Sequence, residues 1–322
     1  MNPVLVEVTR GGRVESVHRG AFAVADVAGG IVLHAGGIDD AIFPRSAVKA
    51  LQALPLVESG AADRYGLTDA EIALACASHS GEPAHVATAR AVLAKAGREE
   101  TCLECGAHWP YDARAARTLA AAGAEPVAAH NNCSGKHAGF ICLACAHGDD
   151  PAGYVRPDHP AMRRVTAALA EATGTTLDTR NRGTDGCSIP TYAIPLRAIA
   201  RAFARFGTAG GAAARIRAAV AAHPFMVGGT DRFDTVLMTA LGARVFAKGG
   251  AEGVHCAALP ELGLGIAIKC DDGGGRAAEL VCAALVTRLL DAEVPAALLR
   301  PELRNWNGIA VGALRAAGPL AA

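Results

Sequence analysis

The first 35 residues alternate between apolar and polar positions in the way that β-strands do. Alternating runs cover 4–8, 14–18 and 21–26, and glycine pairs at 11–12 and 29–30 separate them. Short alternating runs with glycines between them are typical of antiparallel strands joined by turns. We therefore predict a meander of antiparallel strands at the start of the chain.

After Pro44 the spacing of apolar positions becomes that of a helix, and Gly60 ends the first helical run. Helical, mostly alanine-rich segments then continue to about residue 240. The alanine-rich examples are predicted over 84–96, 112–122, 161–172, 196–206 and 212–222.

Strand-like runs return near the other end of the chain, followed by a last helix. The strands are predicted over 243–247, 254–259 and 264–270, and the helix over 276–291. Strands at both ends with helices between them predict an α/β (α+β) fold, in which one antiparallel sheet is assembled from the two chain ends.

We expect one composite domain over residues 1–322, because no repeat or low-complexity linker divides the chain. Its sheet part covers about 1–45 and 243–322, and its mainly helical part covers about 46–242. Clefts often form between two such parts, so an active site is expected there.

The composition excludes several classes of protein. Hydrophobic residues make up 51% of the 322 residues, and 31 basic residues balance 31 acidic ones, so a nucleic-acid partner is not expected. Glu7 interrupts what would be the apolar core of a signal peptide, and no apolar run of membrane-spanning length follows. Ten cysteines without a secretion signal indicate reduced thiols in a cytoplasmic protein.

Ser46 and Lys49 form the first candidate for chemistry, a Ser-x-x-Lys pair at a predicted helix start. The spacing places both side chains on one helix face. A lysine activates a serine hydroxyl as a base if its ammonium is desolvated or lies near other cations. The alternative is a helix-capping serine beside a solvated lysine.

Ser78 lies in a second polar cluster, 76–82, which follows the apolar run 72–76. We expect Ser78 at the end of a strand or buried helix, facing a cleft. The alternative is a serine-rich turn that caps a helix.

A third cluster, 130–137, leads directly into the apolar segment 138–142. Cys133 and Lys136 are one helical turn apart within it. Cys187, in a fourth cluster, is a candidate to join Cys133 as a zinc ligand, because thiolates are preferred by zinc. A lysine ligand is unusual, since the amine must first lose its proton.

Lys248 closes the predicted strand 243–247 and is followed by two glycines, which lets a ligand approach the backbone. Penicillin-recognising serine enzymes carry Ser-x-x-Lys on a helix and Lys-Thr-Gly on a strand in the same order. The arrangement favours a catalytic role for both lysines.

Two Cys-x-x-Cys pairs, Cys102–Cys105 and Cys142–Cys145, leave two interpretations open. They are compatible with a zinc knuckle. The second pair lies in an apolar run, which favours buried thiols that act as small hydrophobic side chains.

Taken together, these motifs resemble the rhizobial-type (type III) L-asparaginases, in order from about Arg10 to Arg288. The matching segments are Phe-Pro-Arg-Ser46-Ala-Val-Lys49, Cys-Ala-Ser78-His-Ser, Cys105-Gly-Ala-His108-Trp-Pro, Asn-Asn-Cys133-Ser-Gly-Lys136-His, Thr-Asp185-Gly-Cys187 and His223-Pro-Phe-Met-Val-Gly-Gly-Thr. The resemblance implies a serine β-lactamase-like fold, hydrolysis of L-asparagine to L-aspartate and ammonia, and a homodimer.

The resemblance also implies roles for individual residues. It pairs Ser46 with Lys49 and Ser78 with Lys248 as two serine–lysine tandems. It assigns zinc (Zn2+) to Cys133, Lys136 and Cys187, beside the substrate pocket. Substrate contacts are expected from residues of the same motifs, namely Asp185, Arg45, His137 and His108.

The expected mechanism is nucleophilic acyl transfer, in which a serine attacks the side-chain amide and its lysine accepts the proton. Ser46 is the preferred nucleophile, because helix geometry fixes its lysine, and Ser78 is its rival. Two other functions stay open: a glutaminase or penicillin-recognising serine amidase, and a zinc-binding protein without catalysis.

Overall fold

A computed structural model describes residues 1–321 of the chain, which separate into two compact units. Among the described residues, the sheet unit consists of 1–47, 193–208 and 236–321, and the helical unit of 48–192 and 209–235. Each unit is described by itself below.

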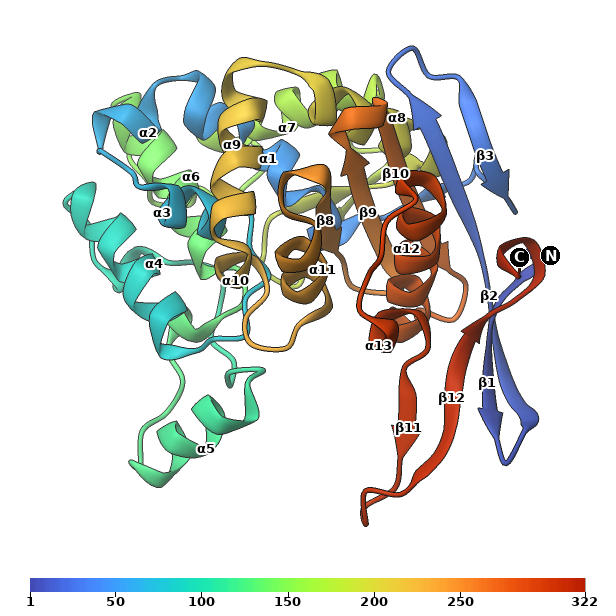
Figure 1. The fold of residues 1–322 in the computed structure, drawn as a ribbon. Helices are drawn as coiled ribbons and strands as arrows, with labels where there is room; N and C mark the ends of the chain where they lie inside the picture. The colour runs from blue at the N-terminus through green and yellow to red at the C-terminus, as the bar shows by residue number, and fades with distance from the viewer. Residues whose placement is uncertain (322) are drawn as a thin grey trace. The chain divides into compact units, whose positions relative to one another are not determined.

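One antiparallel sheet forms the core of the sheet unit (Figure 1). Its strand order is β11-β12-β1-β2-β10-β9-β8, and β3 also pairs with β2. The strands are β1 (Val4–Arg10), β2 (Arg13–Asp26), β3 (Ile31–Ala35), β8 (Phe246–Gly249), β9 (Val254–Leu259), β10 (Leu264–Cys270), β11 (Glu302–Arg304) and β12 (Ala310–Ala316). Because β12 pairs with β1, the two chain ends lie in neighbouring strands.

Strand β2 is one strand of 14 residues, so the predicted division into runs 14–18 and 21–26 is wrong. Gly20 lies where the division was expected. A Cβ atom there would lie 2.4 Å from the carbonyl oxygen of Lys269 on the paired strand β10. Gly20 therefore allows close approach of two strands and does not form a turn.

Two helices of the sheet unit pack on the sheet, α8 (Leu196–Thr208) and α12 (Gly275–Leu290). The face of α8 that carries Ile199, Phe203 and Phe206 is buried, as the helical spacing of these residues requires. The unit also contains α13 (Ala296–Leu299) and the short strands β4 (Ala41–Ile42) and β7 (Ile194–Pro195).

Gly265 allows α8 to pack closely on β10, and its substitution tests this packing. A Cβ atom at Gly265 would lie 2.1 Å from the Ala200 carbonyl oxygen and 2.2 Å from the Ala204 nitrogen. We expect Gly265→Ala to lower the free energy of unfolding by about 3 kcal/mol, because backbone atoms must move apart. The control Gly275→Ala meets no atom within 4 Å and lies at a helix start, so denaturant unfolding should leave it near wild type. Equal stability of both variants would contradict this packing.

The helical unit is assembled around α6 (Ser134–Ala146), which is buried from Ser134 to Ala144. Helices α1, α3, α4 and α7 pack against it. The helices of this unit are α1 (Lys49–Glu58), α2 (Ala61–Arg64), α3 (Asp69–Ala75), α4 (Pro83–Lys95), α5 (Ala113–Ala121), α6, α7 (Pro160–Thr173), α9 (Gly211–Ala222) and α10 (Pro224–Val227). It also holds the hairpin β5 (Arg182–Thr184) and β6 (Pro190–Tyr192), and α11 (Phe233–Leu241) crosses the unit boundary.

The fold class predicted from the sequence is confirmed, because both chain ends contribute strands to one antiparallel sheet and the middle is mainly helical. No helix within residues 1–321 is long and apolar enough to cross a membrane.

Candidate active site

Lys49 is the first residue of α1 and is completely buried. Its Nζ atom donates hydrogen bonds to the Ala77 carbonyl oxygen, to Ser78 Oγ at 2.9 Å and to Cys133 Sγ at 3.0 Å. A lysine Nζ atom has three positions for hydrogen bonds, and these contacts use all of them. A buried lysine in contact with a serine hydroxyl and a thiol is typical of a catalytic site. It is not typical of a solvated lysine on a helix surface.

Ser78 follows α3, whose last turn ends at Cys76. The Ser78 N–H donates to the carbonyl oxygen of Val227 at 3.0 Å, which fixes the backbone. The residue is partly exposed, whereas Lys49 beneath it is buried. A substrate can therefore reach the hydroxyl while the lysine stays shielded from water.

Cys133, Lys136 and Cys187 form a buried cluster beside this pair. Lys136 lies on α6 with its Nζ atom 3.1 Å from Cys187 Sγ, and Cys187 shares a hydrogen bond with Cys133. Cys187 lies in the turn between β5 and β6, directly before Ser188, whose φ angle of 74° is unusual for a residue other than glycine.

The charges in this cluster shift its pKa values. The hydrogen bond from Cys187, together with Lys49 and Lys136, holds the pKa of Cys133 well below its ordinary value despite burial. The same hydrogen bond and burial raise the pKa of Cys187. Burial lowers the pKa of Lys136, but attraction to Cys187 and Cys133 outweighs it, so the pKa is raised. The lowered pKa of Cys133 favours its thiolate form, which lies 3.0 Å from Lys49 Nζ.

The donor set of this cluster fits a zinc ion in its chemistry. Two sulfur atoms in contact and one amine 3.1 Å from the second sulfur can converge on a soft cation, once the amine and the second thiol lose their protons. Residues 1–321 contain no group of three or more His, Cys, Asp or Glu side chains that could hold a metal, so Lys136 is needed to complete the set. Zinc binding stays a prediction.

Asn131 and Asn132, for which the sequence predicted no role, fix the position of the segment before α6 through hydrogen bonds. Asn131 Oδ1 accepts a hydrogen bond from the Cys133 N–H at 2.8 Å, and its Nδ2 donates to the carbonyl oxygen of Cys105 at 2.9 Å. The Asn132 N–H donates to His108 Nε2 at 2.9 Å. The polar run 130–137 was the sequence feature that could have identified these two residues as part of a site.

His108 uses both ring nitrogens within the protein. Nδ1 donates to the Trp109 carbonyl oxygen at 2.7 Å, so Nε2 is the acceptor for Asn132. This arrangement supports a role in positioning the segment that carries Cys133. The predicted contact between His108 and substrate stays a prediction.

His79 is a further residue that the sequence analysis left without a role. It is completely buried, and desolvation holds its pKa well below the ordinary value, so the ring is neutral. Nε2 donates to Ser134 Oγ at 2.9 Å, and Nδ1 accepts from the Gly81 N–H at 3.1 Å. His79 therefore ties the segment with Ser78 to the start of α6, next to Cys133.

His137 and Asp185, two predicted substrate ligands, lie close to the cluster in different settings. His137 is fully buried, and its Nδ1 is 2.6 Å from the Tyr154 hydroxyl, which accepts from the Glu104 N–H and so donates to the histidine. Asp185 is half-buried and close enough to Lys136 to raise its pKa. Their contact with substrate stays a prediction.

The remaining predicted residues, Arg45, Ser46 and Lys248, belong to the sheet unit. Ser46 lies on a 3-10 turn, Arg45–Val48, and Arg45 has a φ angle of 52°. A Cβ atom at Gly250 would lie 2.7 Å from the Pro44 carbonyl oxygen, so the end of strand β8 runs against this turn. Strain at a non-glycine residue beside a close backbone contact is typical of functional sites.

The structure contains a serine–lysine contact that the sequence did not predict. The lysine that the structure bonds to Ser78 is Lys49, within the helical unit. Ser46 and Lys248 share the sheet unit. The expected tandems, Ser46 with Lys49 and Ser78 with Lys248, each join residues of different units and stay predictions.

The Cys-x-x-Cys pairs give no metal site among residues 1–321. Cys105 and Cys142 are buried, and burial raises the pKa of each thiol to about 12. None of the ten cysteines, all of which lie within residues 1–321, forms a disulfide bond. Cys142 thus packs as a small apolar side chain.

The chain was compared with solved structures, with curated proteins and with models of protein families. A β-lactamase from Mycobacterium bovis is 14% identical in sequence, with a TM-score of 0.33, over 84% of this chain and 93% of that one. A likeness at this TM-score does not establish a shared fold. No curated protein matches the chain. The model of the L-asparaginase II family matches residues 6–316. Because that match spans nearly the whole sequence, the chain belongs to the L-asparaginase II family.

Proposed function

We propose that this asparaginase-type amidohydrolase is an L-asparaginase that hydrolyses L-asparagine to L-aspartate and ammonia. Membership of the family supports the reaction class. The observation that carries the assignment to a site is the 2.9 Å hydrogen bond between Lys49 Nζ and Ser78 Oγ.

Ser78 is the nucleophile in this proposal, and Lys49 is its base. A neutral Lys49 amine keeps two donor hydrogens, for Ala77 and Cys133, and offers its lone pair to the Ser78 hydroxyl. As Ser78 Oγ bonds to the side-chain amide carbon, its proton passes to Lys49. The C–N bond then breaks and ammonia leaves with that proton. Water, deprotonated by Lys49, hydrolyses the ester and returns the hydroxyl to Ser78.

The sequence alone favours Ser46, because its spacing to Lys49 suits a helix. Two observations support Ser78 instead. Lys49 is bonded to Ser78, and Ser46 lies on a 3-10 turn before α1 and not within the helix. Ser46 is the rival nucleophile, and experiments need to compare the two.

Cys133, Lys136 and Cys187 are the residues that would hold zinc. When bound there, zinc would supply positive charge that neutralises the thiolates and favours a neutral Lys49, and it would orient the polar ends of the substrate. The chain itself supplies the nucleophile and the base.

Zinc content tests the ligand assignment without an activity assay. We expect purified wild-type protein to carry about one zinc per chain, and Cys133→Ser and Cys187→Ser to lose most of it, because a hydroxyl is a far weaker zinc ligand than a thiolate. Atomic emission spectroscopy measures the ratio. Cys145→Ser, a half-buried cysteine on the same helix as Lys136, is the control and should keep its zinc. Full zinc content in the Cys133 and Cys187 variants would show that the ion binds elsewhere.

An ammonia-release assay with asparagine and glutamine, together with a chromogenic β-lactam, tests the proposed substrate. Preferential turnover of asparagine is expected. Turnover of glutamine or the β-lactam alone would favour another serine amidase, and no turnover with tight zinc binding would favour a non-catalytic protein.

A further inference from the structure

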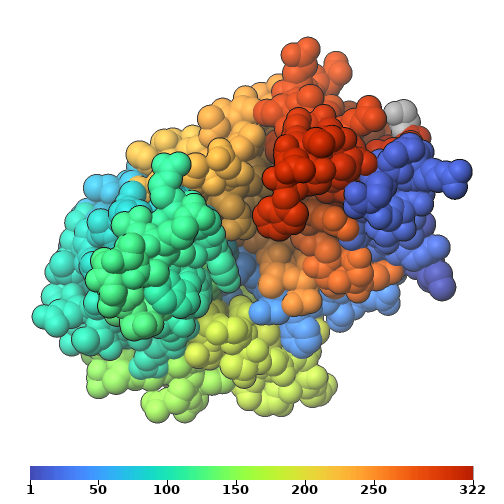
Figure 2. Space-filling model, turned by 90° about the horizontal axis from the view of Figure 1, so that it is seen from below, coloured from blue at the N-terminus to red at the C-terminus, as the bar shows by residue number. Residues whose placement is uncertain are grey.

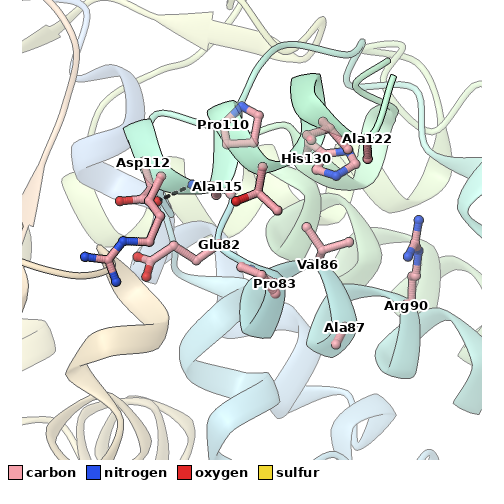
Figure 3. Close-up of a pocket in the computed structure, with 14 residues that line it drawn as sticks. Glu82, Pro83, Val86, Ala87, Arg90, Pro110, Asp112, Ala115, Ala122 and His130 are labelled. Carbon is pink, nitrogen blue, oxygen red and sulfur yellow. Dashed lines mark hydrogen bonds between the residues drawn. The ribbon is translucent and has the colours of Figure 1, made fainter. Parts of the chain in front are cut away.

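A cavity of about 570 Å³ lies in the helical unit between α4 and α5 (Figure 3). Pro83, Val86 and Ala87 of α4 form one wall, and Pro110 and residues of α5 form the other. None of the residues assigned to catalysis or zinc lines it. Its volume is within the range of pockets that hold small organic molecules.

Helix α5 covers this cavity but has no buried residue of its own. Its apolar positions Ala115, Leu119 and Ala122 share one helix face, and all three line the cavity. In Figure 2 the segment around α5, coloured green, lies at the surface. An apolar helix face that lines a cavity of this size leaves room for an apolar ligand between the helices.

Three of the four carboxylate oxygens of Glu82 and Asp112, which line the cavity, accept hydrogen bonds within the protein. Glu82 accepts hydrogen bonds from the Thr230 N–H at 2.8 Å and from the Thr230 hydroxyl at 2.7 Å. Asp112 Oδ1 accepts from the Ala115 N–H at 2.6 Å and caps α5. These bonds reduce the capacity of the cavity to accept hydrogen bonds from a ligand.

Hydrogen-bond donors, in contrast, remain available. His130 Nδ1 accepts from the Val127 N–H at 3.0 Å, so a neutral His130 ring carries its hydrogen on Nε2. Burial lowers the pKa of His130 and favours that neutral form. Arg90 uses Nε for Glu100 and keeps its other N–H groups, and Arg114 has no ion pair with any residue in 1–321.

From the apolar walls and the available donors, we propose that this cavity binds a small organic carboxylate with an aromatic or branched aliphatic body. The body lies between α4 and α5, and the carboxylate accepts hydrogen bonds from an arginine at the rim. This binding site is separate from the amidohydrolase site and does not depend on its mechanism.

Isothermal titration calorimetry with 4-phenylbutyrate tests the proposal in the absence of asparagine. One saturable site per chain is expected, and the neutral analogue 4-phenylbutyramide should bind at least about tenfold more weakly, because it lacks the charge. No saturable binding of the acid, or equal affinity for acid and amide, would overturn the proposal.

Variants locate the site. Ala87→Phe fills the cavity and should weaken binding at least about tenfold, whereas Ala84→Phe, on the same helix but outside the cavity, should not.

At least one of Arg90→Gln and Arg114→Gln should weaken binding about tenfold relative to Arg117→Gln, whose arginine lies on α5 but does not line the cavity. Thermal unfolding confirms that each variant is folded. Wild-type affinity in Ala87→Phe, or in both arginine variants, would contradict the site.

Discussion

Ser78→Ala is expected to lower kcat for asparagine by at least about 10⁴-fold, because removal of a nucleophile leaves only binding and electrostatic effects. The substitution deletes one partly exposed oxygen atom, so the fold and zinc content should be kept. Initial rates of ammonia release at saturating substrate measure the loss.

Two serines serve as comparisons for that result. Ser80 donates to the Gly228 carbonyl oxygen and is buried, so Ser80→Ala should retain most activity at some cost in stability. Ser46→Ala should keep more activity than Ser78→Ala. The opposite order, with near-normal turnover in Ser78→Ala, would make Ser46 the nucleophile.

Lys49→Met and Lys49→Arg are both expected to lower kcat by about 10³-fold or more. Methionine fills the buried space but has no base, and arginine keeps a positive charge but does not lose its proton in a protein. The pair of variants therefore separates the loss of a base from the loss of a charge, as measured by ammonia release under the same conditions.

Lys95→Met is the matched control for those variants. Lys95 bonds to the buried carboxylate of Glu71 and lies outside the site, so its substitution should affect stability and not kcat. If Lys49→Arg retained near-normal turnover, Lys49 would act as a charge and another group would be the base.

Much of the fold could be predicted from local patterns. Helix α8 and strands β9 and β10 begin at the predicted residues, because their apolar positions follow the periods of a helix and a strand. The patterns wrongly divided β2 into two runs, because Gly20 lets this strand continue in close contact with β10. Strands β11 and β12 were not specified, since β12 is rich in alanine and glycine and its pairing with β1 joins opposite ends of the chain.

The sequence identified candidate site residues but not their connections. Lys49 reaches Ser78 and Cys133, which are 29 and 84 residues away, through packing that a local spacing rule does not contain. The Ser-x-x-Lys spacing pointed to Ser46, because a regular helix was assumed from residue 46. The structure begins α1 at Lys49 and places Ser46 on the preceding turn.

The supporting residues were the hardest to predict. His79, Asn131 and Asn132 orient the site through hydrogen bonds to Ser134, Cys133 and His108. Polar residues near a catalytic motif are common at any turn, so their role appears only when donors and acceptors are placed in space.

Covalent labelling tests most directly whether Ser78 is the nucleophile. An asparagine analogue with a diazomethyl ketone in place of the side-chain amide can alkylate an activated nucleophile in the site. After inactivation, peptide mapping by mass spectrometry should find one adduct per chain on Ser78, and asparagine should protect against it. An adduct on Ser46, or inactivation that leaves Ser78 unmodified, would contradict the assignment of Ser78 and Lys49 as the catalytic pair.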